Sequence, residues 1–414
     1  MFDFRNYVYD FENSRFVVGG ESMIFHCHHY NTFLQRSIMD AEYVDSAPFL
    51  VGAAAESAFL QLSDLLSTVP GIEPRKRFVE ELYRQSGFGT IDLSGVTENG
   101  GTVRTSSSHY SLGWKEKFGR SGVPVVFFSA GFLAGALAAV YGIPLSGVTS
   151  VQTACMSTGA SEDVFVLGRG EANFSLFPPK PPVTLLPVEA CREPDTPVDR
   201  KGIAKALAAM PILGNDRGII PAFGVYLTRM YADYYNRISF EFEKSLRKTV
   251  GDEGLGISSR LFVEAGHVCG FSTFYGIMTS PEWDALIRPM LKSREDWVHG
   301  MVSAVNALGW GVWKVLELSP DRAVFRLAND YESLGYLRMY GPADHGISYL
   351  ATGGAASIMN LVYVCEIEST PRLAADTYRD LFRDPSRTHP YQGRMTACQG
   401  QGDPHTEIAV ERAP

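Results

Sequence analysis

The sequence has no extended stripe of basic residues and no closely spaced cysteine pair. Its 414 residues carry a formal net charge of −9, and the Lys and Arg residues are dispersed. We therefore expect no nucleic-acid partner, because such binding needs clustered cations that displace phosphate counterions. The six cysteines show no Cys-x-x-Cys spacing, which favours reduced thiols over disulfides.

A targeting signal is also lacking at the N-terminus, where residues 1–16 mix acids and aromatics, so we expect a cytoplasmic protein. One uncharged run, residues 123–145, has the length to cross a bilayer. Pro124 and Pro144 bracket it and small residues interrupt it, which predicts a buried strand at 125–128 and a helix at 131–141. We expect no membrane partner.

Motifs for several common chemistries are missing. The chain has no His-Glu-x-x-His, no Gly-x-Ser-x-Gly and no nucleotide-binding glycine loop. A nucleotide cofactor is therefore not expected.

What the chain does have is an internal repeat. Four blocks match in order: His26 onward with His267 onward, "SLGW" at Ser111 with "SLGY" at Ser333, "AGFLAGALAAVY" with "TGGAASIMNLVY", and "TACMSTG" with "TACQGQG". The offsets are 241, 222, 222 and 243, and the second copy has an insertion after Tyr363.

The repeat predicts two domains of the α/β (α+β) class, with mainly antiparallel sheets and packed helices. We place the first copy at 1–177, a proline-rich linker at 178–199 and the second copy at 200–414. The apolar spacing at 221–246 predicts a helix that leads into the second copy.

The end of each copy resembles the 4-vinyl reductase, or hydrocarbon-binding, domain family. "GDPHTEIAVE" at 402–411 is similar to the closing motif of the family, and the first copy has Cys155, Gly159 and Phe165 in register. The resemblance implies a domain that binds a small hydrophobic molecule.

The family motif can hold zinc through one Glu and two Cys. At those places the first copy has Gln152, Cys155 and Asp163, and the second copy has Met395, Cys398 and Thr406. A soft cation prefers a tetrahedral set of thiolate and imidazole ligands. We therefore expect that Cys155 and Cys398 are buried core residues.

Histidines crowd into "FHCHHYNTF" at 25–33. If 25–30 is a strand, His26 and His28 share one face and form a pair of metal ligands. The alternative is that these imidazoles only form hydrogen bonds within the core or with a substrate.

Acids and further histidines complete two candidate metal sites. These sets are His26, His28 and Glu56 in the first copy, and Glu264, His267 and His299 in the second. Each copy could hold a metal, or both could line one site. His109 is a further candidate, as a general acid or base.

Two functions are consistent with these patterns. The first is a metal-dependent oxidoreductase, with iron preferred and zinc or copper possible, acting on a small organic molecule in a pocket of Tyr30, Phe33, Phe271 and Phe274. The second is a non-catalytic protein that binds, senses or carries a small hydrophobic molecule. A homodimer is compatible with either function.

Overall fold

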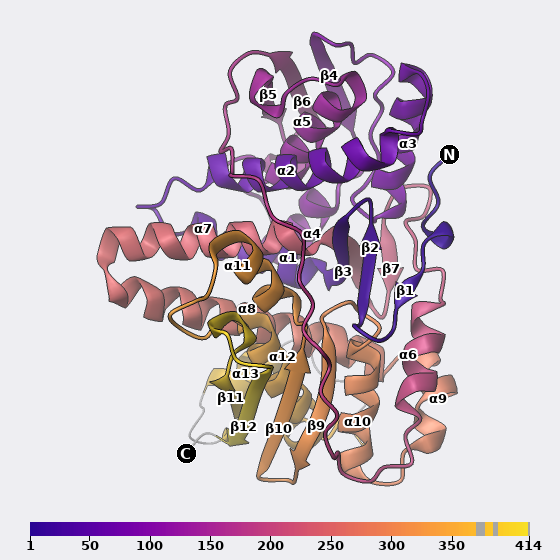
Figure 1. The fold of residues 1–414 in the computed structure, drawn as a ribbon, viewed down its shortest axis with the longest axis vertical. Helices are drawn as coiled ribbons and strands as arrows, with labels where there is room; N and C mark the ends of the chain where they lie inside the picture. The colour runs from indigo at the N-terminus through magenta and orange to yellow at the C-terminus, as the bar shows by residue number, and fades with distance from the viewer. Residues whose placement is uncertain (370–376, 384–387, 413–414) are drawn as a thin grey trace.

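The computed structural model describes residues 1–369, 377–383 and 388–412. Helices pack around three sheets in these residues, and every strand pairing is antiparallel. The predicted α+β class is confirmed (Figure 1).

The first copy places helices before and between its strands. Its elements are β3 (Glu21–Cys27), α1 (His28–Met39), α2 (Ala47–Leu66), α3 (Ile72–Gln85), β4 (Gly100–Thr105), α4 (His109–Phe118), α5 (Phe127–Tyr141), β5 (Val148–Ala154) and β6 (Asp163–Arg169).

The second copy repeats this order. Its equivalents are β8 (Val225–Tyr231), α7 (Ala232–Val250), α8 (Asp252–Met278), α10 (Arg294–Val305), β10 (Arg322–Ala328), α11 (Tyr331–Tyr340), α12 (Tyr349–Met359), β11 (Tyr391–Ala397) and β12 (Thr406–Arg412). Elements outside the repeat are β1 (Tyr9–Asp10), β2 (Arg15–Val18), α6 (Arg200–Ala208), β7 (Ile220–Ala222), α9 (Pro281–Leu286), β9 (Val312–Leu318) and α13 (Thr377–Arg383).

A sheet shared by both copies joins them. Its strand order is β1-β2-β3-β8-β7, so the equivalent strands β3 and β8 pair at its centre. Equivalent positions in β3 and β8 differ by 205 in residue number. Exchanging each residue of the pair Ile24–Met230 for its equivalent gives Arg229–Phe25, which is also a pair in this sheet. The copies are therefore related by a pseudo-twofold axis through this strand pair.

Each copy is built on two closely packed apolar helices. A Cβ added at Gly131 of α5 would lie 2.1 Å from the carbonyl oxygen of Val51 in α2, and one added at Gly353 of α12 would lie 2.1 Å from that of Val263 in α8. Glycine is required at both contacts because any side chain would collide with the neighbouring backbone.

Helix α2 has the length and hydropathy to cross a membrane, the one such helix in the described part of the chain. It is 67% buried over its most apolar window, as in the core helix of a soluble protein. Most of the uncharged run that the sequence indicates, 123–145, forms α5, which is almost wholly buried.

The chain between β6 and α6 has no helix or strand over 175–199 and runs across both copies (Figure 1). Lys180 lies within it and is buried, with its Nζ 2.7 Å from Asp233, 3.3 Å from Glu21 and 3.9 Å from Glu56. Asp233 also pairs with Arg338 at 2.8 Å. One linker cation therefore joins carboxylates of both copies in a buried network.

Several local predictions need correction. The predicted strand at 125–128 is absent, because α5 begins at Phe127. The predicted helix at 221–246 begins only at Ala232, and the strands β7 and β8 occupy its first part. The apolar residues of this window run on from β8 into α7, and the sequence window merged the strand with the helix.

The first repeat block is also misaligned. His267 lies in α8, whereas His26 lies in β3, so an offset of 241 does not relate equivalent elements. The element order pairs β3 and α1 with β8 and α7 instead, which aligns "YN" at Tyr30 with "YN" at Tyr235. The other three blocks fall on equivalent elements.

Candidate functional site

The predicted histidine strand ends earlier than expected. Strand β3 ends at Cys27, and His28 is the first residue of α1. His26 and His28 therefore do not share one strand face, and the geometric basis of that pair is wrong. The Nδ1 of His28 accepts a hydrogen bond from the amide of Tyr226 at 3.1 Å, and burial, with the nearby Lys117 charge, lowers the His28 pKa to about 4.

His26 lies in an aromatic box between the copies. Its ring stacks on Tyr30 at 4.4 Å and on Trp310 at 4.9 Å, and meets Tyr235 edge-on at 4.8 Å. The ring is fully buried, which lowers its pKa well below the ordinary value. The imidazole is therefore neutral at physiological pH.

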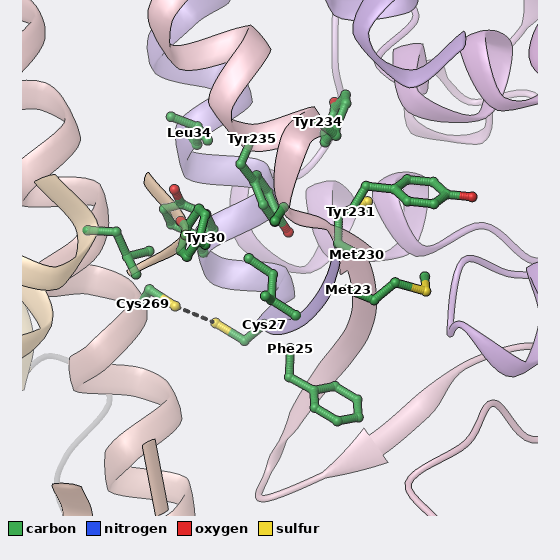
Figure 2. Close-up of a cluster of buried hydrophobic side chains, with 14 of the residues drawn as sticks. Met23, Phe25, Cys27, Tyr30, Leu34, Met230, Tyr231, Tyr234, Tyr235 and Cys269 are labelled. Carbon is green, nitrogen blue, oxygen red and sulfur yellow. Dashed lines mark hydrogen bonds between the residues drawn. The ribbon is translucent and has the colours of Figure 1, made fainter. Parts of the chain in front are cut away.

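Two cysteines meet beside this box. The Sγ atoms of Cys27 in β3 and Cys269 in α8 are 3.9 Å apart (Figure 2). The Nδ1 of His26 is 3.4 Å from the Cys269 sulfur. Burial acts to raise the pKa of Cys27, but hydrogen bonds with Cys269 and Thr273 outweigh it and bring the pKa to about 6.

His109 belongs to a buried hydrogen-bond chain. The Nδ2 of Asn31 donates to the Nε2 of His109 at 2.9 Å and to the hydroxyl of Thr228 at 3.0 Å, while the Asn31 oxygen accepts from Tyr235. Because Nδ2 only donates, His109 carries its proton on Nδ1. Burial lowers the His109 pKa to about 3, which makes it a neutral member of the core.

Glu56 has cationic partners in the core. Its carboxylate accepts from Arg237 at 3.1 and 3.2 Å and lies 3.9 Å from Lys180. Arg237 comes from α7 of the second copy. The acid that stood out in an apolar helix is thus explained by a salt bridge between the copies.

The second candidate set is dispersed. Glu264 is exposed on α8, while His267 is buried and shares a hydrogen bond with Asn360 at 2.9 Å. His299 is buried in α10, and burial brings its pKa to about 4. Across residues 1–369, 377–383 and 388–412, no three His, Cys, Asp or Glu side chains are grouped so that they could hold a metal ion.

The four predicted pocket aromatics have different neighbours. Tyr30 stacks on His26, and the ring of Phe33 lies under the Lys117 ammonium at 5.1 Å. Phe271 meets Tyr378 at 5.3 Å, and Phe274 meets Trp310 at 5.6 Å. Tyr30 and Phe274 thus flank the same His26–Trp310 stack, whereas Phe33 and Phe271 contact other residues.

The family-motif positions form closed hydrogen-bond clusters. In the first copy the hydroxyl of Ser111 lies 2.8 and 2.9 Å from the Asp163 carboxylate and 3.6 Å from Cys155. In the second copy the carboxylate is Asp330, which accepts from Thr406 at 2.9 Å and from Ser348 at 3.0 Å. Cys155 and Cys398 are both fully buried, as expected.

The second copy has an open groove of about 520 Å³ between α8, α12 and β11. Its walls mix apolar and polar groups, contributed by Leu255, Gly256, Ser259, Val263, His345, Gly346, Tyr349, Thr352, Gly393, Arg394, Met395, Thr396, Ala397, Gln401 and Asp403. A smaller groove of about 340 Å³ lies in the first copy near Phe59 and Arg75.

One end of the 520 Å³ groove carries a relay of titratable groups. The buried Glu243 accepts from the hydroxyl of Tyr349 at 2.5 Å, and its other oxygen lies 2.9 Å from the Nε2 of His345. The Nδ1 of His345 lies 2.5 Å from Asp344. Burial opposes protonation of His345, but the hydrogen bonds to both carboxylates outweigh it and raise its pKa.

Sequence reasoning missed this groove. His345 stands in a loop-like stretch, and Glu243 precedes it by 102 residues, so no local spacing connects them. Only the "SLGY" block nearby marks this region as part of a repeated unit.

Comparisons with known proteins find a likeness among solved structures. No family profile matches the chain, and no curated protein matches it. Among solved structures, the chain resembles the phenol-responsive sensory domain of the transcription activator PoxR, solved with phenol. The TM-score is 0.36 at 15% identity, over 52% of this chain and 90% of that domain. The 4-vinyl reductase resemblance therefore stays a prediction from the sequence motifs.

Proposed function

We propose that the protein binds a small organic molecule in the 520 Å³ groove between α8, α12 and β11. The observation that carries this proposal is the combination of volume and lining. Ligand pockets in proteins are typically about 300–1,000 Å³ and combine apolar walls with a few convergent polar groups. The groove has both features, with Val263 and Met395 among its apolar residues and His345 and Tyr349 at its polar end.

The competing hypothesis of an iron-dependent oxidoreductase has less support. It needs imidazole and carboxylate ligands grouped around one point, and the described residues form no such group. The histidines on which the hypothesis rests have core roles instead. His26 stacks between aromatic rings, and His109 bonds Asn31.

The polar end is suited to orienting a ligand. Carboxylates flank His345 on both sides and raise its pKa. The imidazole therefore stays protonated to a higher pH than an ordinary histidine. Because both imidazole N–H groups and the Tyr349 O–H donate to carboxylates, this end can orient a ligand through the charge of His345 and through the free acceptor lone pair of the Tyr349 oxygen. We therefore propose binding or sensing rather than chemistry at this site.

A variant that fills the groove tests the proposal. Gly256 lines the groove, and a Cβ added there has no atom within 4 Å, so Gly256→Trp projects a large ring into open space without a backbone clash. Gly122 is equally open but lies in a loop of the first copy, so Gly122→Trp is the matched control.

The measurement is a thermal-shift screen of small organic compounds against three proteins. The proposal predicts that some compounds raise the melting temperature of the wild type and of the control Gly122→Trp. The same compounds should not raise the melting temperature of Gly256→Trp. Compounds that stabilise all three proteins equally, or no stabilising compound at all, would contradict it.

A further inference from the structure

The floor of the 520 Å³ groove includes an unpaired strand edge. Strand β11 is the last strand of its sheet and pairs only with β12. The amide and carbonyl of Tyr391 point away from β12, because both bond the side chain of Asn360. Residues two apart on a strand direct these groups the same way, so Gly393 also presents its N–H and C=O outward. Among the described residues none forms a hydrogen bond with the outward N–H or C=O of Gly393.

The first copy shows what the equivalent edge binds. Strands β5 and β11 correspond residue by residue at an offset of 243, including the bulge at Gln152/Ala154 and at Met395/Ala397, so Gly393 corresponds to Ser150. The Asn173 carboxamide accepts from the Ser150 amide at 3.0 Å and donates to the Ser150 carbonyl at 3.0 Å.

The segment that carries Asn173 continues over helix α2. The amide of Ser175 donates to the carbonyl of Pro48 at 2.9 Å, and the Ser175 carbonyl lies where a Cβ on Gly52 would be. Val51 of α2 and Val263 of α8 are equivalent, because each contacts the corresponding glycine of the partner helix. Pro48 and Gly52 therefore correspond to Arg260 and Glu264, on the turns of α8 that border the groove. The first copy thus covers with its own chain a place that the described residues of the second copy leave open.

The same two-point pairing recurs elsewhere in the molecule. A carboxamide accepts from the amide and donates to the carbonyl of one backbone residue in three further pairs. These are Asn360 with Tyr391 at 2.8 and 3.0 Å, Asn306 with Trp313 at 2.7 and 3.0 Å, and Asn329 with Leu186 at 2.9 and 3.0 Å.

We infer that the groove selects a ligand that bears a primary carboxamide, which pairs with the N–H and C=O of Gly393 as Asn173 pairs with Ser150. This inference rests on the proposed binding function and names the chemical class of the ligand. A carboxamide has one acceptor and one donor side by side in a plane, which matches the strand edge. A carboxylate of the same shape only accepts, so it leaves the Gly393 carbonyl facing a second acceptor.

Matched pairs of probes test the inference. They also distinguish a free small molecule from a protein segment as the source of the carboxamide. Benzamide against benzoate represents a free small molecule. The peptide Ala-Asn-Phe-Ser-Leu-Phe, which is the sequence of residues 172–177, against the same peptide with Asp for Asn represents a protein segment. Each probe is titrated by saturation-transfer NMR into the wild type, Gly256→Trp and Gly122→Trp.

We expect benzamide or the Asn peptide to bind about tenfold or more tightly than its acid counterpart, because one hydrogen bond is lost and one carbonyl is left unpaired. Gly256→Trp abolishes that binding and Gly122→Trp does not. Tighter binding of the acids, or carboxamide binding that survives in Gly256→Trp, overturns the inference.

The outcomes separate this inference from the proposed function. If the groove binds compounds without a carboxamide, and Gly256→Trp removes their binding, the function stands and the ligand class is wrong. If Gly256→Trp changes the binding of no compound, both are wrong. Preference for the Asn peptide over benzamide would identify a protein segment as the source of the carboxamide.

Discussion

Tyr30 and Tyr235 occupy equivalent positions in the two copies, and their rings meet at 5.2 Å across the pseudo-twofold axis. Each tyrosine precedes an asparagine, Asn31 or Asn236, in the first turns of equivalent helices. The residues that the sequence marks most strongly, from His26 in β3 to Tyr30 in α1, therefore form the joint between the copies (Figure 2). Their arrangement explains assembly of the fold, and the open groove lies elsewhere.

Asn31 is expected to contribute strongly to stability. Asn31→Ala leaves Tyr235, Thr228 and His109 with unsatisfied buried polar atoms, at about 1–3 kcal/mol for each group that finds no new partner. Asn236→Ala should cost less, because its carboxamide has one close partner, the Tyr331 carbonyl at 3.0 Å. Urea unfolding of both variants measures the difference, and the reverse order would contradict this role.

Lys180 should be critical for the joint despite its place in a linker. Lys180→Met removes the cation and leaves Glu21 and Asp233 as buried, poorly compensated carboxylates, with an expected loss of about 3–5 kcal/mol. Lys201→Met, at an exposed position in α6, serves as the control. Equal free energies of unfolding for the two variants would show that the network does not stabilise the fold.

The pH dependence of stability should carry the signature of His345. Its pKa is raised in the folded state, so its protonation stabilises the fold fully below about pH 6.5, the ordinary histidine value. That contribution is lost as the pH rises through the folded-state pKa. The difference in unfolding free energy between the wild type and His345→Gln should therefore shrink as the pH is raised from 6 to 9. A constant or growing difference would be inconsistent with the hydrogen bonds to Glu243 and Asp344.

Metal analysis tests the two predicted ligand sets directly. Mass-spectrometric elemental analysis of untagged protein should find transition metal well below one ion per chain, unchanged in His26→Ala and His267→Ala, because the described residues form no ligand group. Near-stoichiometric iron, zinc or copper that falls in either variant would restore the metal-dependent hypothesis.

The sequence predicted the fold class and most of the internal repeat. Three of the four repeat blocks fall on equivalent elements, because the small residues of α5 and α12 are needed for close helix packing in both copies. The closing motifs match for a similar reason, since the turn ending at Gly159 or Gly402 needs a left-handed glycine in both copies.

The joint and the groove could not be predicted in the same way. Glu56 and Arg237 are 181 residues apart, and Glu243 and His345 are 102 apart, so their pairing depends on the pseudo-twofold arrangement. The equivalence of β3 with β8 was hidden because, at the offset of 205, His26 corresponds to Tyr231 and His28 to Asp233, and few letters are shared. Dense histidine spacing was read as metal chemistry, whereas desolvation and ring stacking make His26 a neutral core residue.

The most direct test of the proposed function is a crystal structure of the protein soaked with the compound that gives the largest groove-dependent thermal shift. We predict ligand density between α8, α12 and β11, in contact with Gly393 and near His345. Density in the first-copy groove beside Phe59, or within the aromatic box around His26, would contradict the account and move the binding site to the other copy or to the joint.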